Sequence, residues 1–273
     1  MTPSFRVSAH VAIVSALTLV LDVQDVIAHI FEESYFCSEL QRLTRSGTEA
    51  FLEALAALNI EVVLFTVDQH EVFEEYLDSI DQQGIIEQCV SKRMTSQRHV
   101  NIAGQDTSIA FRDVSIFNRI QILKLETVPE IAALQPLNSL TIPAFRGFEY
   151  VFDLTLMQLV CWLEFVKSYR LPVSHFLTFY KKEVETSLLY ARMDELDLTQ
   201  CLLPFSVGPV GLAIAKEMLP AEVYPTYVEA QKRSLPLVTD KGFDMKHTDT
   251  TTGGLESNES FLMHFDLNDS VRR

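Results

Sequence analysis

An acidic residue, Asp22, directly follows the apolar run Leu17–Leu21. A continuous, partly β-branched run of this kind is typical of a buried strand in a parallel sheet. Open α/β sheets place their chemistry at the carboxyl ends of such strands, so the Asp22 carboxylate stands where a nucleophile would be needed. The alternative is a structural role, in which Asp22 ends the strand by binding a backbone amide.

Two further apolar runs lead to residues that could join Asp22. The run Ile60–Thr66 ends in a hydroxyl, and the run Ile120–Leu125 is followed by the acid Glu126. Thr66 could equally begin a helix, and Glu126 could equally be an ordinary solvated acid. Ser139–Ile142 is a fourth, shorter strand candidate.

The segments between these runs predict an α/β fold with a doubly wound, mostly parallel sheet. Ser46 and Glu49 have the spacing of a capping box before a helix with one apolar face, and a second amphipathic helix follows Asp68. Strand, helix, strand, helix at short spacings is typical of right-handed βαβ units. Residues 90–117 interrupt this order with short alternating pieces and a turn, so we expect a small β-hairpin insertion there.

We expect the α/β domain to span residues 1–166 and to close with a helix on which Trp162 is a packing residue. Residues 167–273 are expected to form a helical and extended C-terminal region that binds partners. This region begins with a helix over His175–Met193. An apolar patch punctuated by Gly and Pro follows at residues 202–215, and it would need a partner if it were exposed.

Charge and composition narrow the classes of partner. The 37 acidic residues outnumber the 22 basic ones, for a net charge of −15. This field repels phosphate backbones, and because no local basic patch is evident we expect no direct nucleic-acid binding. It suits basic, amphipathic peptides, although an acidic excess also simply aids solubility.

Two further sequence features exclude other kinds of site. The four cysteines are widely spaced without a metal-ligand pattern, so we expect them to be reduced and mostly packed. The apolar run Val7–Leu21 contains His10 and Ser15 and falls short of the roughly twenty residues that a membrane span needs. We therefore expect no transmembrane helix of the chain's own.

Six segments, in order, resemble the phosphatases that act on the C-terminal domain of RNA polymerase II, within the haloacid dehalogenase (HAD) superfamily. They are Leu19–His29 for L-V-L-D-x-D-x-[TV]-L-x-H, Arg45–Gly47 for R-P-G, Val63–Thr66 for V-L-[FW]-[TS], Arg112–Ser115 for K-D-L-S, Gln135–Asn138 for Q-P-E-N-A, and Leu163-Glu164 for F-L-E. The resemblance spans roughly residues 17–166 and implies a HAD-like Rossmannoid fold. The sequence looks most similar to the mitochondrial, Tim-fifty-like branch, the presequence receptor of the inner-membrane translocase.

The resemblance implies a reaction that needs a carboxylate nucleophile, a general acid/base two residues later, a hydroxyl and a cation for the phosphate, and acids for Mg²⁺. Asp22 matches the nucleophile and Thr66 the hydroxyl. Gln24 stands at the acid/base position and cannot take or give a proton. Asp25 comes one residue too late, which on an extended backbone turns its side chain to the other face.

The cation and metal positions differ from the family pattern as well. Arg112 stands in place of the lysine and keeps the charge but not the reach, unless it pairs with the neighbouring Asp113. The family's V-D-[DN]-S becomes Leu125-Glu-Thr-Val128, in which Thr127 is a poor metal ligand. A residual Mg²⁺ site would then consist of Asp22 and Glu126. We interpret the site as vestigial, in a chain that is not an enzyme and has no cofactor of its own.

These observations leave three functions open. The first is a pseudo-phosphatase that serves as an accessory or scaffold subunit of a large mitochondrial, inner-membrane-associated assembly, which the long C-terminal region and the patch at 202–215 favour. The second is a component of the presequence receptor of the import translocase, which the resemblance and the acidic charge favour. The third is a weakly active, Mg²⁺-dependent phosphatase with Asp22 as nucleophile.

Overall fold

The computed structural model describes residues 17–30, 42–66, 90–95, 99–101, 108–110, 113–117, 121–147 and 150–234. All of them belong to the first of two compact units, Met1–Pro236, and the second unit, Leu237–Arg273, lies outside the described residues. Among the described residues, no helix combines the length and the hydrophobicity that crossing a bilayer requires.

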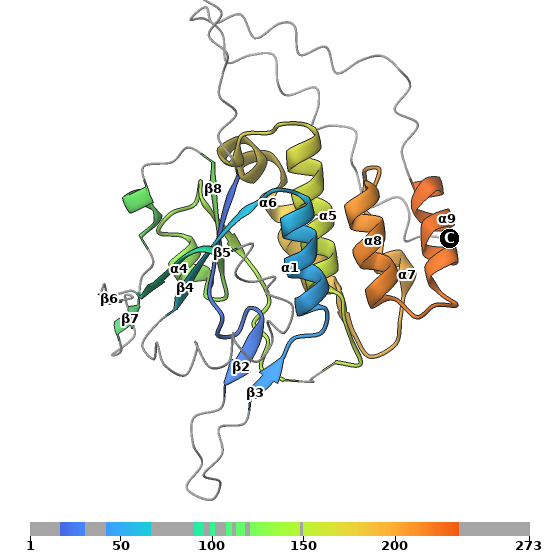
Figure 1. Cartoon of the computed structure of the whole chain (residues 1–273), viewed down its shortest axis with the longest axis horizontal. Helices are drawn as coiled ribbons and strands as arrows, with labels where there is room; N and C mark the ends of the chain where they lie inside the picture. The colour runs from blue at the N-terminus through green and yellow to red at the C-terminus, as the bar shows by residue number, and fades with distance from the viewer. Residues whose placement is uncertain are drawn as a thin grey trace, which may run out of the picture. The chain divides into compact units, whose positions relative to one another are not determined.

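A five-stranded sheet in the order β5-β4-β1-β8-β9 forms the centre of this unit (Figure 1). Every neighbouring pair in it is parallel. The strands are β1 (Thr18–Leu21), β4 (Glu61–Thr66), β5 (Val90–Thr95), β8 (Ile122–Glu126) and β9 (Ser139–Thr141). The chain runs outward from β1 to β5 and then returns to β8 and β9 on the other side of β1, so the predicted doubly wound sheet is confirmed.

Side chains alternate between the two faces of the sheet. Leu19, Leu21, Leu123 and Leu125 belong to the main hydrophobic core, whereas Val20 belongs to a smaller cluster with Val63, Val114 and Ile122. The main core lies under α1 (Thr48–Ala57) and α5 (Thr155–Ser168), which run beside each other along the sheet (Figure 1). The smaller cluster includes Val114 of the short helix η1 (Val114–Phe117).

Three two-stranded antiparallel sheets accompany the central one. They pair β2 (Ala28–Ile30) with β3 (Arg42–Thr44), β6 (His99–Asn101) with β7 (Ser108–Ala110), and β10 (Phe152–Asp153) with β11 (Arg192–Met193). The β6–β7 pair lies inside the expected hairpin insertion at 90–117. The first part of that insertion was placed wrongly, because β5 pairs in parallel with β4 as an edge strand of the main sheet.

The C-terminal helices belong to the same unit and pack on α5 directly or through one another, whereas the sequence led us to expect a division after residue 166. They are α6 (Val173–Tyr190), α7 (Leu198–Cys201), α8 (Pro209–Met218) and α9 (Tyr224–Ser234); α4 (Pro129–Ala132) lies earlier, between β8 and β9. Helix α5 is buried at most of its positions, including Cys161 and Trp162, and these need cover beyond what the sheet supplies.

The patch at 202–215 provides part of this cover and is not exposed as the subunit hypothesis supposed. Leu203, Phe205 and Ile214 are buried in the main core. The Trp162 ring lies 4.7 Å from the ring of Phe205 in an edge-to-face contact, and its Nε1 donates to Ser187 Oγ at 2.9 Å. Trp162 is therefore a packing residue, as predicted.

Candidate phosphatase-like site

The strands β1 and β8 bring Asp22 and Glu126 to the same edge of the sheet. Val20 pairs with Lys124 in a parallel register, and Asp22 and Glu126 each lie two residues further along. Asp22 is 7% exposed and Glu126 is 2% exposed, so Glu126 is not the solvated acid of its alternative interpretation. The backbone N–H of Gln24 donates to Asp22 Oδ1 at 3.3 Å, which orients this carboxylate.

The side chain of Gln24 lies in a polar cluster formed by the turn after β1. Its Nε2 is 3.1 Å from Asp25 Oδ1 and 3.2 Å from His29 Nδ1, and the same Nδ1 is 2.6 Å from Asp25 Oδ1. The amide of Gln24 donates a hydrogen bond to the Asp25 carboxylate, but a side-chain amide cannot serve as a general acid or base.

Asp25, one residue past the acid/base position, has a backbone conformation that differs from the one we expected. Its backbone is left-handed, with φ of 63°, and not extended. Its N–H donates to Ala28 O at 2.6 Å, and its carbonyl accepts from the N–H of Phe145 at 2.6 Å. Because its carboxylate also binds Gln24 and His29, Asp25 closes the turn and makes His29 part of it.

Lys124, which the sequence interpretation did not single out, lies beside Glu126. Its side chain is fully buried, and its Nζ is 3.3 Å from Glu126 Oε1. A signal was present in the sequence, because a lysine inside the apolar run Ile120–Leu125 must be paired if the run is buried.

The other predicted site residues stay predictions. Thr66 is the last residue of β4, at the same edge as Asp22, and its side chain lies outside what the structure describes, as does the whole of Arg112. Thr127 follows β8 and is half-buried. Within the described residues, no group of three or more His, Cys, Asp or Glu is arranged to hold a metal ion.

Arg45, from the segment that resembles R-P-G, is a buried residue that holds the loops around this edge. Its Nε and Nη2 donate to the two carboxylate oxygens of Asp153 at 3.0 and 3.2 Å. Its Nη1 donates to the carbonyl oxygens of Val26 and Pro143. Burial lowers the pKa of the guanidinium, and Asp153 opposes that effect. Arg45 therefore joins the turn after β1, the loop after β9 and the start of α5.

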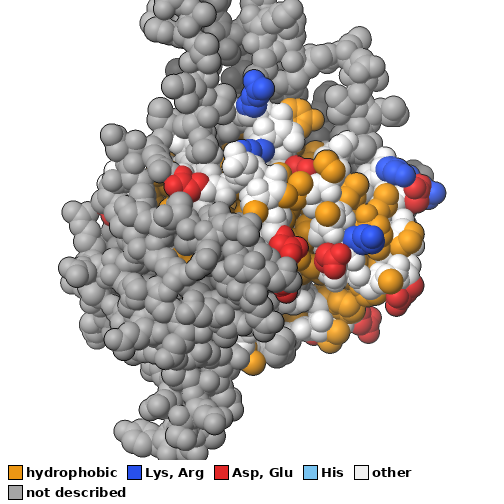
Figure 2. Space-filling model, viewed as in Figure 1, with side chains coloured by type: hydrophobic (Ala, Val, Ile, Leu, Met, Phe, Trp, Pro, Cys, Tyr) orange, Lys and Arg blue, Asp and Glu red, His pale blue; other side chains and the backbone are white. Residues whose placement is uncertain are grey.

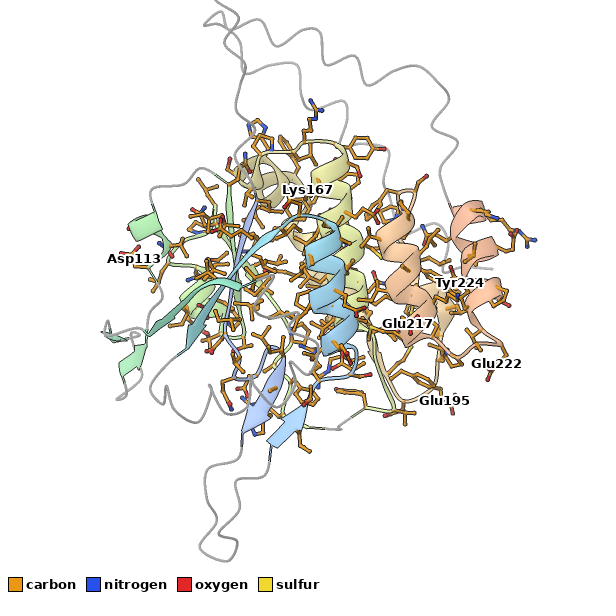
Figure 3. All side chains as sticks on the ribbon, in the orientation of Figure 1. Asp113, Lys167, Glu195, Glu217, Glu222 and Tyr224 are labelled. Atoms are coloured by element: carbon orange, nitrogen blue, oxygen red, sulfur yellow. The ribbon has the colours of Figure 1, made fainter. Side chains whose placement is uncertain are left out.

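The described part of the K-D-L-S-like segment, residues 113–115, meets the segment Gln135–Asn138 on the η1 side of the sheet. Gln135 Nε2 donates to Asp113 Oδ1 at 3.0 Å, and that same oxygen accepts from Ser115 N at 3.0 Å at the start of η1. Asn138 Nδ2 donates to Ile122 O at 3.1 Å. Asp113 lies on the far side of the sheet from α8 and α9 (Figure 3).

Glu164, from the segment that resembles F-L-E, binds the first turn of α8. Its carboxylate accepts from the N–H of Val210 at 3.1 Å and from that of Gly211 at 2.7 Å. A carboxylate is favourable there because the first N–H groups of a helix have no partner within it. A side chain on Gly211 would come within 2.9 Å of Cys161 Sγ, so glycine allows this close approach.

Comparison with known proteins identifies a family for this part of the chain. The family model described as NLI interacting factor-like phosphatase matches residues 17–172, which is more than half of the chain. No curated protein matches. A solved structure of an uncharacterized protein from Listeria monocytogenes serotype 4b is similar at 15% identity over 46% of this chain and 66% of that chain, just under two thirds of its length, with a TM-score of 0.27.

The family model covers the five strands of the central sheet and the six segments that carried the resemblance. The predicted relation to HAD-type phosphatases of the polymerase-tail kind is thereby confirmed, and the relation to the mitochondrial branch stays a prediction. The chain belongs to the NLI interacting factor-like phosphatase family.

Proposed function

We propose that this chain is a catalytically impaired member of its family that works as a protein-binding accessory subunit of a mitochondrial, inner-membrane-associated assembly. The proposed catalytic impairment rests on Gln24, whose amide occupies the acid/base position within a hydrogen-bonded cluster with Asp25 and His29. Loss of general acid/base help costs on the order of 10²–10⁴ in rate. The changes at Arg112 and Thr127 add to that loss.

Exposed apolar side chains on α6 support the binding role. Phe179, Leu189 and Tyr190 are 53%, 59% and 55% exposed. Phe179 and Tyr190 are separated by about three helical turns and so lie on one outward stripe of the helix. Apolar surface of this kind is a common feature of docking sites on proteins that assemble with others.

The runner-up function, a component of the presequence receptor, is supported by acidic groups on another part of the surface. Glu195, Glu217 and Glu222 are exposed residues of the segments that contain α7, α8 and α9 (Figure 3). Hydrophobic, acidic and basic side chains are interspersed over the face that carries α8 and α9 (Figure 2). Such a surface would complement a helix with one basic and one apolar face.

Substitutions on these two surfaces separate the two functions. The double variant Phe179→Ser/Tyr190→Ser is expected to release the full chain from its assembly, as seen by co-migration in native gels of mitochondrial extract. A matched control is Leu134→Ser/Leu137→Ser, which removes exposed apolar side chains from the loop between α4 and β9. An isolated chain that behaves as a stable monomer in size exclusion would weaken the subunit function.

Cross-linking to a basic presequence peptide at low salt tests the receptor function. If that function holds, Glu217→Gln/Glu222→Gln lowers the cross-linking yield, and salt lowers it further because the contact is electrostatic. Equal yields for the variant and the wild type would contradict it and leave the subunit function in place.

A further inference from the structure

The ion pair between Lys124 and Glu126 is built into the interior of the sheet. Lys124 is 0% exposed and Glu126 is 2% exposed, with Nζ and Oε1 3.3 Å apart. Taking an ammonium ion out of water is strongly unfavourable unless opposite charge receives it. The Glu126 carboxylate therefore provides opposite charge within reach of the buried Lys124 ammonium.

Lys124 lies on the side of the sheet to which Asp22 and Glu126 also belong. Leu123 and Leu125 belong to the main core, so Lys124 between them is on the opposite face, with Ile122 of the smaller cluster. Asp22 follows Leu21 of the main core in the same way. Because Val20 pairs with Lys124, the side chain of Lys124 starts two residues before the level of the two acids on both strands.

The family resemblance implies that the acid at position 126 helps to hold Mg²⁺, and the residues present do not fit that ion. Mg²⁺ demands near-octahedral oxygen ligands at about 2.0–2.1 Å, several of them carboxylates or waters. Glu126 already binds an ammonium ion, which repels a second cation, and Thr127 replaces the other metal acid. The donor set that remains is thus smaller and less negative than the family's.

We propose that the Lys124 ammonium takes the place of the metal ion, so that it compensates Asp22 and Glu126 from within the sheet and the site binds no divalent cation. This inference rests on the proposed function, because a domain that turns over no phosphate has no need of the metal's chemistry. It assigns to Lys124 a positioning role for the two acids.

The test compares melting temperatures of the full chain in EDTA and in about 10 mM MgCl₂. The wild type is expected to melt at the same temperature in both, and to bind no Mn²⁺ by electron paramagnetic resonance. Lys124→Met keeps most of the side-chain volume and removes the charge. It is expected to melt lower in EDTA and to recover part of the loss in MgCl₂. Lys124→Met/Glu126→Gln removes both charges and should show no response to Mg²⁺.

Two results would overturn the inference. One is a Mg²⁺-dependent rise in the melting temperature of the wild type that Asp22→Asn abolishes. The other is a folded Lys124→Met variant that does not respond to Mg²⁺. If Lys124→Met does not fold, the response of the wild-type melting temperature to Mg²⁺ decides whether the inference holds. Mg²⁺ binding without phosphate turnover would refute this inference alone, whereas turnover that needs no Mg²⁺ would refute only the proposed function.

Discussion

Two groups of polar residues surround the central sheet, and they differ in how they relate to the family pattern. The first group, which we call the frame, keeps the family's residue types, and each side chain binds another part of the chain. Its members are Arg45, Asp113, Gln135, Asn138 and Glu164. The second group, the edge, lies where β1 and β8 end, and its members are Asp22, Gln24, Lys124 and Glu126.

At the edge, only Asp22 keeps the type that the resemblance assigns to it. Gln24 is an amide where the family has an acid, and Glu126 forms an ion pair with Lys124. The frame fixes loops and helix ends, and its interactions stabilise the fold whether or not phosphate is turned over. The architecture of a phosphatase-like domain can therefore be maintained by residues that take no part in phosphate chemistry.

Substitution of Arg45 is expected to lower the free energy of unfolding the most. Replacing it with Met leaves Asp153 buried without its main partner, and breaking a buried ion pair in this way costs about 3–5 kcal/mol. The free energy of unfolding from urea titration measures the loss. Lys232→Met is the control, because Lys232 and Glu229 are exposed and such pairs contribute little. If both variants lose equally little unfolding free energy, the ion pair of Arg45 does not stabilise the frame.

A smaller loss of unfolding free energy is expected at Glu164, another member of the frame. Glu164→Gln removes the charge that faces the first turn of α8 and weakens two hydrogen bonds, at a cost of about 1–2 kcal/mol. The matched control is Glu217→Gln on the exposed side of α8, which should leave the urea midpoint unchanged. A loss at Glu217 as large as that at Glu164 would show that the cap contributes nothing specific.

The buried thiols are expected to have the smallest effect on the free energy of unfolding at neutral pH. Their effect increases as the pH rises. Burial raises the pKa of Cys201 to about 12, and burial, with Glu164 as a secondary cause, raises the pKa of Cys161 well above the normal range. The unfolded thiols ionise near pH 8.5. Above that pH the unfolded chain releases protons that the folded chain keeps, so stability falls as pH rises, by about 1.4 kcal/mol per pH unit per thiol.

Urea titrations between neutral pH and about pH 10 check this slope. Cys201→Ala should show a shallower slope than the wild type, since one buried thiol is gone. An unchanged slope would mean that Cys201 is not shielded in the way the structure describes.

The sequence predicted the elements whose signal is local. The four core strands were found because each is a short segment rich in apolar residues. The edge strand β5 was missed because Val90–Thr95 carries Lys92 and Arg93, as a solvent-facing hairpin would. The start of α1 was also wrong: the expected capping box at Ser46 is absent, and α1 begins after left-handed Gly47, with the Thr48 hydroxyl donating to Arg45 O at 2.8 Å.

The rest depended on contacts between distant segments. Whether the patch at 202–215 is exposed or packed depends on α5, whose buried side chains it covers. The pairing of Lys124 with Glu126 depends on both faces of β8 being buried. The replacement at Gln24 could be identified from the sequence alone, because a side-chain amide cannot transfer a proton in any fold.

We propose that the edge does not support phosphate transfer, and turnover of para-nitrophenyl phosphate with Mg²⁺ measures this activity. The full wild-type chain and its Asp22→Asn variant should release nitrophenol at the same background rate. A wild-type rate above background that Asp22→Asn abolishes would contradict the claim and make the chain a working phosphatase.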